Sequence, residues 1–487
     1  MNRRREFWLR TLVAAIIGGL ATTAVADVFP NPSIAQNNRS GSNRYNGLKR
    51  ALFYVVHDDD VTFSTSEWNS IVASIRSKEL ATREFYAENS GGKFDIYYDP
   101  VIVNAPIPLN ADNTRPSNWT TLANNIASGP SYNLNLSNYY MTAYDVSRTT
   151  ADPGQGWGGL STGTSIYLQQ TNGWLINHEI GHQVNPGSND HAKAIRQLED
   201  SNFHPCYWDK TSLSYENYVP GVSPFTPVPF GAAHYEYGNP FDTMGNINTN
   251  ATGGHFRIQV KRRDLNWLTS SQVPDLGSPS AGDVGTYKIY AHDELQSVTD
   301  ANGNFGVVQG YNPNVFYGLS YTRQGRTFST TSGNFVNQNQ TIDLEYRSGK
   351  NGIAFYLNGS LIDMDPDGGE SYSNHERLLE IGNQIEDVDF GMSNFLVDAG
   401  AIDSTPSGID FLSFNPPPPT ISAASWLHFL VGPTGSDPIG SYITVTISLA
   451  NALSGIAGDL NRDGVLNSTD LNLFVTGWLS NTSTLSS

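Results

Sequence analysis

The pattern of apolar residues changes near Pro274, and this change restricts the fold more than any other feature of the chain. Before it, stretches with helical spacing alternate with short apolar runs. After it, strand-like runs follow one another between turns such as Asn302-Gly303 and Asn358-Gly359. A chain of 487 residues is also longer than one hydrophobic core usually supports. We therefore expect an α+β domain followed by a β-sandwich-like domain.

Shifts in composition divide the chain into six segments, and one break is the stiff run of prolines at 416–419. From the N-terminus, we expect a signal peptide at 1–26, a flexible lead at 27–48, an α+β domain at 49–272, a β-sandwich-like accessory domain at 284–400, a linker rich in Pro, Gly and Ser with short strands at 401–453, and a small calcium-loop segment with a helix at 454–482. Within the α+β domain, the spacing of apolar residues predicts strands at 51–56, 94–103 and 164–168 and helices at 67–86 and 255–268.

The first 26 residues have the pattern of an export signal. A basic start is followed by an apolar run at 11–20 and by the small residues Ala24-Val25-Ala26. The sequence Arg4-Arg5-Glu6-Phe7 is typical of the twin-arginine route, and an ordinary Sec signal is the alternative. No later stretch has the ~18 apolar residues that a membrane span needs. We expect a mature chain without a membrane span that is secreted or held at the cell envelope.

The formal net charge of -18 argues against nucleic acid or an anionic membrane surface as the main partner, because a polyanion repels an acidic protein. Cys206 is the only cysteine. The chain therefore has no intramolecular disulfide and no cysteine-rich metal site.

The segment from His178 to His182 carries the strongest chemical signal. Its two histidines are four residues apart, so on a helix both rings project from one face and can share one metal ion. Glu179 lies beside them, where its carboxylate can take a proton from a zinc-bound water. Thr171-Asn172 can cap the helix. These residue types at this spacing predict Zn²⁺ as cofactor and Glu179 as general base in peptide hydrolysis.

A catalytic zinc needs a third protein ligand and an open position. The residues at 186–189 must break the helix, so the chain turns after His182 and can bring back His191, the favoured third ligand. Glu199 would take that place in a site built on two helices. Other candidates for the third ligand are Asp190, His204, His234 and His255.

Several motifs in combination resemble the metzincin zinc peptidases, and within them the gametolysin-like group of bacteria and algae. The similar segments are the histidine helix at 178–182, the segment 235–246 with Met244, the residues 254–256 with 265–268, and upstream 85–86, 90–92 and 156–160. The resemblance covers residues 50–275 and implies a metzincin-like catalytic domain over 49–272. It also implies that 235–246 forms a Met-turn, with Met244 packed beneath the metal and not bound to it.

The loop before the third ligand departs from the family pattern. The family spacing HExxHxxGxxH would place glycine at 185 and histidine at 188, where this chain has Asn185 and Ser188. The loop is three residues longer, with Gly187 for the turn and His191 as ligand. The resemblance further implies that the β-rich region is an accessory domain, because residues 361–366 are similar to a segment found there.

Residues 459–470 fit a twelve-residue calcium loop, with a glycine at the sixth position. The expected Ca²⁺ ligands are Asp459, Asn461, Asp463, the carbonyl of Val465, Asn467 and Asp470. The segment resembles one of the two repeats of a type I dockerin, which implies a cohesin-like or envelope anchor. A calcium-stabilised tail and an Asx-rich surface loop are the alternatives.

The leading interpretation is a secreted zinc-dependent endopeptidase acting on a protein or glycoprotein substrate. The alternative is a non-catalytic adhesive or binding protein, attached to the envelope or to a scaffold, that retains the metzincin fold. A metal-dependent hydrolase of another amide or ester is a third interpretation.

Overall fold

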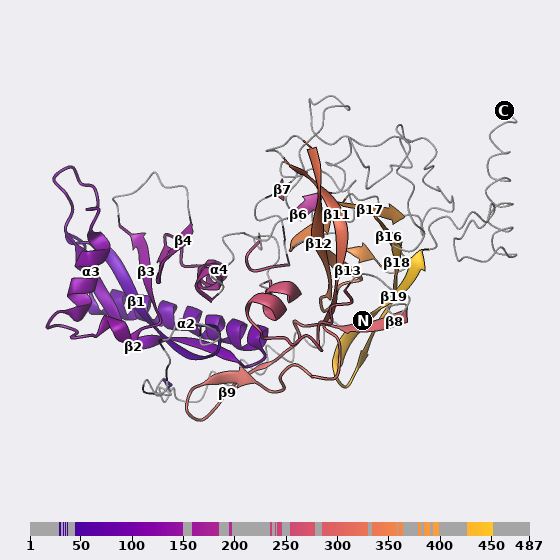
Figure 1. Ribbon diagram of the computed structural model, residues 1–487. Helices are drawn as coiled ribbons and strands as arrows, with labels where there is room; N and C mark the ends of the chain where they lie inside the picture. Colours follow the sequence, from indigo (N-terminus) through magenta and orange to yellow (C-terminus); the bar gives the residue numbers. More distant parts are fainter. Residues whose placement is uncertain are drawn as a thin grey trace, which may run out of the picture.

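The computed structural model of the protein describes residues 29–30, 33, 35, 37, 44–149, 158–184, 194–196, 234–235, 239, 241–245, 254–277, 285–329, 334–357, 359–363, 378–380, 384–389, 393–398 and 426–450. Figure 1 shows an α/β part, drawn in indigo to magenta, beside a β-rich part drawn in orange and yellow. The predicted ligand His191 and the predicted calcium loop at 459–470 lie outside the described residues. Among the helices described, each is too short or too polar to cross a membrane.

The α/β part is built on a mixed five-stranded sheet in the order β2-β1-β3-β5-β4. Its strands are β1 (Gly47–Asp58), β2 (Phe94–Ile107), β3 (Met141–Arg148), β4 (Gly159–Thr162) and β5 (Ser165–Leu168). Strands β2, β1, β3 and β5 pair in parallel, and β4 pairs antiparallel with β5. An antiparallel strand therefore ends this sheet, next to the predicted zinc helix.

Helices cover both faces of this sheet. They are α2 (Thr65–Ser90), α3 (Trp119–Ser128) and α4 (Gly173–Val184), with a short 3-10 turn η3 (Leu136–Asn138). Side chains alternate along β1, so Phe53 packs in the core shared with α2 and α4, while its neighbour Tyr54 packs in the core shared with α3. The side chain of Ser64 caps the N-terminus of α2.

The β-rich part contains two larger sheets and one hairpin. One sheet has the order β11-β12-β13-β14-β6-β7, with β15 also paired to β13, and the other has the order β17-β16-β18-β19-β8. The strands are β6 (Ala194–Arg196), β7 (His234–Tyr235), β8 (Gly285–Tyr290), β9 (Ser297–Thr299), β10 (Phe305–Val307), β11 (Gly318–Ser329), β12 (Asn334–Tyr346), β13 (Gly352–Leu357), β14 (Ser360–Asp363), β15 (Leu379–Glu380), β16 (Gln384–Asp389), β17 (Ser393–Asp398), β18 (Trp426–Asp437) and β19 (Gly440–Ala450).

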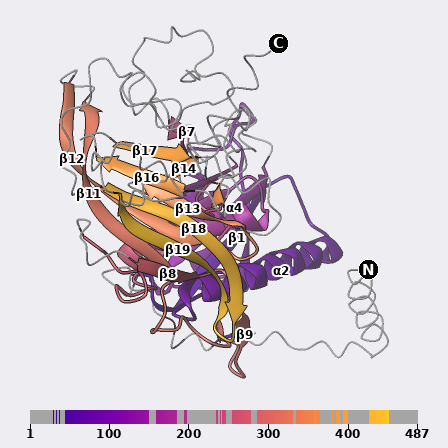
Figure 2. The same cartoon turned by 90° about the vertical axis from the view of Figure 1, so that its right-hand side faces the viewer.

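Apolar side chains of both larger sheets form one core. Phe355 of β13 and Phe429 of β18 have ring centroids 5.4 Å apart, and both are fully buried. Figure 2 shows the long strands β11, β12, β18 and β19 following a common curve. The two larger sheets therefore pack against each other across a shared core.

Two elements differ from the sequence-based expectation. Residues 426–450 form strands of 12 and 11 residues in one sheet with β8, whereas we expected a linker with short strands over 401–453. The helix expected at 255–268 is reduced to a short helical stretch that includes η6 (Val260–Asp264). Backbone N–H groups before η6 donate to distant side chains instead of to a helix: Phe256 N donates to Asn89 Oδ1, and Ile258 N donates to Glu345 Oε2.

Candidate metal centre

The helix α4 is fixed on the sheet by its own sequence. The side chain of Asn172 accepts a hydrogen bond from Leu175 N at 3.1 Å, which satisfies one free N–H of the first turn. Leu175, Ile176, Ile180 and Val184 are buried in the core of the sheet. The opposite face, which bears the two histidines, is thereby held at a fixed height above the sheet.

The imidazoles of His178 and His182 face each other. Their Nε2 atoms are 3.2 Å apart, and their ring centroids are 4.8 Å apart. Two ligands bound to one tetrahedral Zn²⁺ at 2.0–2.1 Å would be separated by about 3.3 Å. Without an ion, the same contact is a hydrogen bond from one ring to the other. The pair therefore has the separation that a shared ion requires.

The orientation of His178 is set by a residue 65 positions further along the chain. Its Nδ1 lies 3.0 Å from the carbonyl oxygen of Thr243. Because a carbonyl can only accept, Nδ1 carries the proton and Nε2 keeps its lone pair. A backbone carbonyl that holds the other ring nitrogen is a common support for a metal-binding histidine.

Glu179 is buried, with 4% of its surface exposed. Burial raises the pKa of its carboxyl group to about 8. Its Oε2 atom has no hydrogen-bond partner among the described residues. Its Oε1 atom lies 2.5 Å from the position that a Cβ on Gly159 of β4 would occupy. The carboxyl group is thus pressed against the edge strand, with one oxygen left for a group that the described residues do not supply.

The turn at 241–245 lies against α4. The Sδ atom of Met244 lies 2.5 Å from the position that a Cβ on Gly181 would occupy, so a larger residue at this position would force Met244 to move. Asp242 holds the turn by accepting from Met244 N at 2.9 Å, and it forms an ion pair with Arg257 at 3.2 Å. The apolar Met244 therefore packs against the helix that carries both imidazoles.

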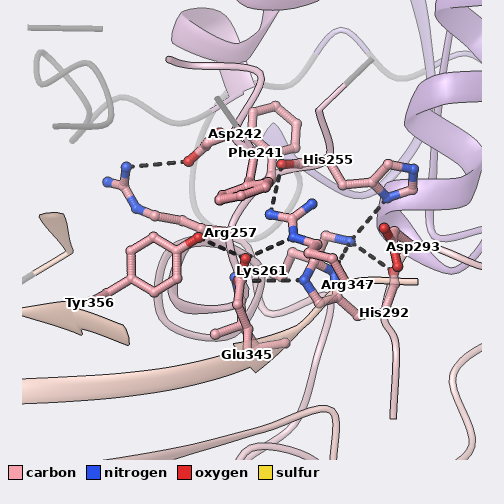
Figure 3. Close-up of polar contacts among 12 residues, drawn as sticks. Phe241, Asp242, His255, Arg257, Lys261, His292, Asp293, Glu345, Arg347 and Tyr356 are labelled. Carbon is pink, nitrogen blue, oxygen red and sulfur yellow. Dashed lines mark hydrogen bonds and ion pairs between the residues drawn. The ribbon is translucent and has the colours of Figure 1, made fainter. Parts of the chain in front are cut away.

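Behind this turn lies a group of buried polar residues that joins the two parts of the molecule. We call it the junction cluster; Figure 3 shows its members Asp242, His255, Arg257, Lys261, His292, Glu345, Arg347 and Tyr356. Lys261 Nζ lies 2.9 Å from His292 Nδ1 and 3.4 Å from His255 Nδ1. Arg347 donates to Glu345 Oε1 at 2.7 Å.

Burial sets the protonation of this cluster. Desolvation and the positive charges of Lys261 and Arg347 lower the pKa of His292 to about 4. Burial also penalises the charge on Glu345, but Arg347 and His292 outweigh it and hold the pKa of this carboxyl well below its usual range. The cluster is therefore built around an ionised carboxylate and neutral imidazoles.

The structure brings together His178, Glu179, His182 and Met244 from the predicted set. His191 and all six predicted calcium ligands lie outside the described residues. Among the other candidates for the third ligand, His255 belongs to the junction cluster, and His234 begins β7. Within the described ranges, no group of three His, Cys, Asp or Glu side chains could hold a metal.

Three supporting residues were not identified from the sequence. Thr243 contributes a backbone carbonyl, which no residue type signals. Gly159 and Gly181 make room for Glu179 and Met244. A glycine inside a helix costs stability relative to alanine, so Gly181 between two histidines was a signal of close packing.

The residues that are described fit a zinc ion in three respects. The two Nε2 atoms have the required separation, the tautomer of His178 leaves a lone pair at the site, and Glu179 Oε2 is buried without a partner in the described part. Imidazole nitrogen is a preferred zinc ligand. Comparison with protein-family models, curated proteins and solved structures finds no match to this chain.

Proposed function

We propose that this protein is a secreted or envelope-held zinc-dependent endopeptidase of the metzincin type. His178 and His182 would hold the ion together with His191, Glu179 would act as general base, and Met244 would pack beneath the metal. The observation that carries this proposal is the 3.2 Å separation of the two Nε2 atoms, beside a buried carboxyl group.

The proton transfer is assigned to Glu179. When bound, a zinc ion would supply positive charge that polarises the peptide carbonyl and acidifies the attacking water. The same charge would lower the raised pKa of the Glu179 carboxyl group, so that Oε2 accepts the proton of that water and returns it to the leaving amine. In this role the buried position of the carboxyl group matters, because a proton held at Oε2 is shielded from exchange with bulk solvent.

The edge of the sheet supports a peptide as substrate. β4 is the last strand of the sheet in the described part, and it pairs with β5 on one side only. Its Gly159 contacts Glu179, so an extended chain added beside β4 would run past the general base. Strand addition to an exposed edge is a general mode of peptide recognition that reads main-chain groups. This favours an endopeptidase over a hydrolase of small esters.

The direct test compares the wild-type protein with Glu179→Gln. We expect stoichiometric zinc in both, measured by elemental analysis, and a loss of casein cleavage of about 10²- to 10⁴-fold in the variant, which is the usual contribution of a general base. The substitution keeps the size of the side chain and removes only its basic oxygen. Small ester and amide substrates are tested beside casein.

Three results would count against this proposal. Absence of zinc from the purified wild-type protein would remove the metal site. Zinc binding without cleavage by either protein would support a non-catalytic binding protein. Cleavage of small esters but not of casein would support a different hydrolase.

A further inference from the structure

We propose that the β-rich part positions the metal ligand His178, with Glu345 of β12 as the central positioning residue. The proposal rests on the zinc site proposed above. It assigns to the β-rich part a role in metal binding: two chains of contacts start at Glu345 and end on the helix α4. One runs through the turn at 241–245, and the other runs through residues 254–258.

The first chain starts at Glu345 Oε1. This oxygen accepts the hydroxyl proton of Tyr356 on β13 at 2.7 Å. Asn239 Nδ2 lies 3.5 Å from the same hydroxyl oxygen, and Asn239 Oδ1 accepts from Phe241 N at 2.9 Å. Two residues later, the carbonyl of Thr243 accepts the Nδ1 proton of His178. Tyr356 thus orients the amide that starts the turn.

The apolar side of the turn is held by the same strands. Phe241 packs in a buried cluster with Tyr356 and Ala354 of β13 and Leu361 of β14. Gly245, at the other end of the turn, packs so closely on the backbone of Asn239 that a Cβ would collide with it. The turn is therefore closed on itself, and it is fixed to the β-rich part by the contact of Asn239 with Tyr356 and by the packing of Phe241.

The second chain starts at the other oxygen of the same carboxylate. Glu345 Oε2 accepts from Ile258 N at 2.6 Å. Phe256, two residues before Ile258, places its ring 3.2 Å from the position that a Cβ on Gly181 would occupy, between the two histidines. Gly254, at the start of this segment, accepts a hydrogen bond from the side chain of Thr243. Both chains therefore meet at the residues that contact α4.

Burial makes this carboxylate a rigid support. Glu345 and Tyr356 are both fully buried, and Arg347 holds the carboxylate at 2.7 Å. Buried hydrogen bonds permit few alternative arrangements, so displacement of Glu345 or Tyr356 moves the groups that are bonded to it. Outer partners of metal-binding histidines act by fixing the ring orientation.

The experiment uses the full mature chain and measures the zinc dissociation constant by competition with a chromophoric chelator. Tyr356→Phe removes the hydroxyl that links Glu345 to Asn239 and leaves the buried charge intact. Loss of a direct outer partner weakens metal binding about 10- to 100-fold. Because Tyr356 lies one layer further out, we expect a loss of about 3- to 10-fold. Glu345→Gln is measured where it folds.

Tyr290→Phe is the matched control. The hydroxyl of Tyr290 also donates to a carboxylate of the β-rich part, Asp437 Oδ2 at 2.7 Å, but among the described residues it makes no hydrogen bond to the turn at 241–245. We expect its zinc affinity to stay within about twofold of the wild-type value, as for an independent site. Asn239→Ala is the second variant, and the double variant Tyr356→Phe with Asn239→Ala should bind zinc no more weakly than the weaker single variant.

The outcomes separate this inference from the proposed function. Equal zinc affinity in Tyr356→Phe and Tyr290→Phe, or additive losses in the double variant, would overturn the positioning role. A purely structural role would lower the Tm of the zinc-free and zinc-loaded proteins equally and leave the dissociation constant unchanged. A wild-type protein without zinc affinity would instead remove the proposed function itself.

Discussion

At the scale of single residues, the contact between Gly159 and Glu179 sets the position of the proposed general base. A Cβ at 159 would lie 2.5 Å from Glu179 Oε1, whereas a Cβ at the neighbouring Gly158 would meet its nearest atom at an ordinary 3.6 Å. We expect Gly159→Ala to displace the carboxyl group and to lower kcat/KM by at least about 10-fold, since misplacement by 1 Å can cost 100-fold.

Gly158→Ala is the control for this prediction, with activity close to wild type. Zinc content should be unchanged in both variants, because neither side chain reaches the imidazoles. Equal activity of the two variants in the casein assay would show that Gly159 does not position the base.

Gly181 is the second residue at which a single methyl group is informative. Alanine there would collide with Met244 Sδ at 2.5 Å and with the ring of Phe256 at 3.2 Å. We expect Gly181→Ala to destabilise the protein by about 1–3 kcal/mol, the usual cost of overpacking, in urea unfolding. A Cβ on Gly173, at the start of the same helix, would meet no atom within 4 Å, so Gly173→Ala should leave the stability unchanged or raise it. An equally stable Gly181→Ala would contradict the packing described.

From the sequence we could predict that the candidate ligands His178 and His182 lie side by side on one helix, next to Glu179. His178, Glu179 and His182 follow from the spacing of four and the helical period. The carbonyl of Thr243 could not be predicted in this way, because every residue has a carbonyl and only the fold decides which one meets the imidazole. Met244 was expected from resemblance, and its contact with Gly181 comes from the structure.

At the scale of elements, the hairpin β9–β10 joins the β-rich part to the α/β part through hydrogen bonds to Arg83 and Asp95. Arg83 of α2 donates two hydrogen bonds to Asp95 of β2, at 2.9 and 2.7 Å, and one to the carbonyl of Gly303 in the hairpin at 2.6 Å. The hairpin also donates to the same carboxylate: Phe305 N forms a hydrogen bond with Asp95 Oδ2 at 3.0 Å. A buried ion pair thus supports both the sheet and the hairpin.

Removal of one partner from this ion pair should be costly. Asp95→Ala leaves the guanidinium of Arg83 buried without its carboxylate, and we expect a loss of about 3–5 kcal/mol in the free energy of unfolding. The exposed pair Lys288–Asp437 offers a contrast, because solvent screens it and Lys288→Ala should change stability little. Denaturant unfolding of both variants measures the difference in the free energy of unfolding. Similar losses would show that the buried pair of Arg83 and Asp95 contributes no more to stability than an exposed ion pair.

Element types were predicted from the sequence more successfully where the stabilising contacts are local. The helix at 67–86 was predicted by its periodicity, and α2 contains it. The segment 255–268 also has apolar periodicity, but Asn89 and Glu345 take its backbone N–H groups across long sequence distances. Hydrogen bonds to such distant residues override the local helix preference, and nothing in the segment's own sequence indicates them.

At the scale of the whole molecule, the junction cluster predicts a dependence of stability on pH. His292 has a pKa of about 4 in the folded protein against an ordinary 6.5. The unfolded chain therefore binds a proton between these values that the folded protein does not, so the contribution of His292 to stability is full above pH 6.5 and falls as the pH drops toward 4. The expected contribution is about 3 kcal/mol.

Unfolding in urea at pH 7, 5.5 and 4 measures this slope. His292→Asn keeps an acceptor for Lys261 and removes the titrating ring, so its stability should depend less on pH over this window. A slope equal to that of the wild-type protein would show that other groups cause the acid sensitivity. The same comparison at pH 7 gives the cost of the substitution itself.

The burial of the junction was not predictable from composition. Lys261-Arg262-Arg263 reads as a basic surface run, yet Lys261 is fully buried between His292 and Tyr311. A charged run is normally solvated. Here Lys261 is buried because His292 and Tyr311, both further along the chain than β8, accept its hydrogen bonds. The two-domain interpretation from the sequence therefore omitted the contact that joins the domains.

This buried junction has a consequence for how the protein can be divided or recombined. A fragment ending near residue 277 would present Lys261, Arg257 and His255 to water on a surface shaped for other partners, and the remaining β-rich half would expose Glu345 and Arg347. Neither half is a module that can be transplanted alone. An engineered chimera would therefore need strands β12 and β13 together with helix α4 as one unit.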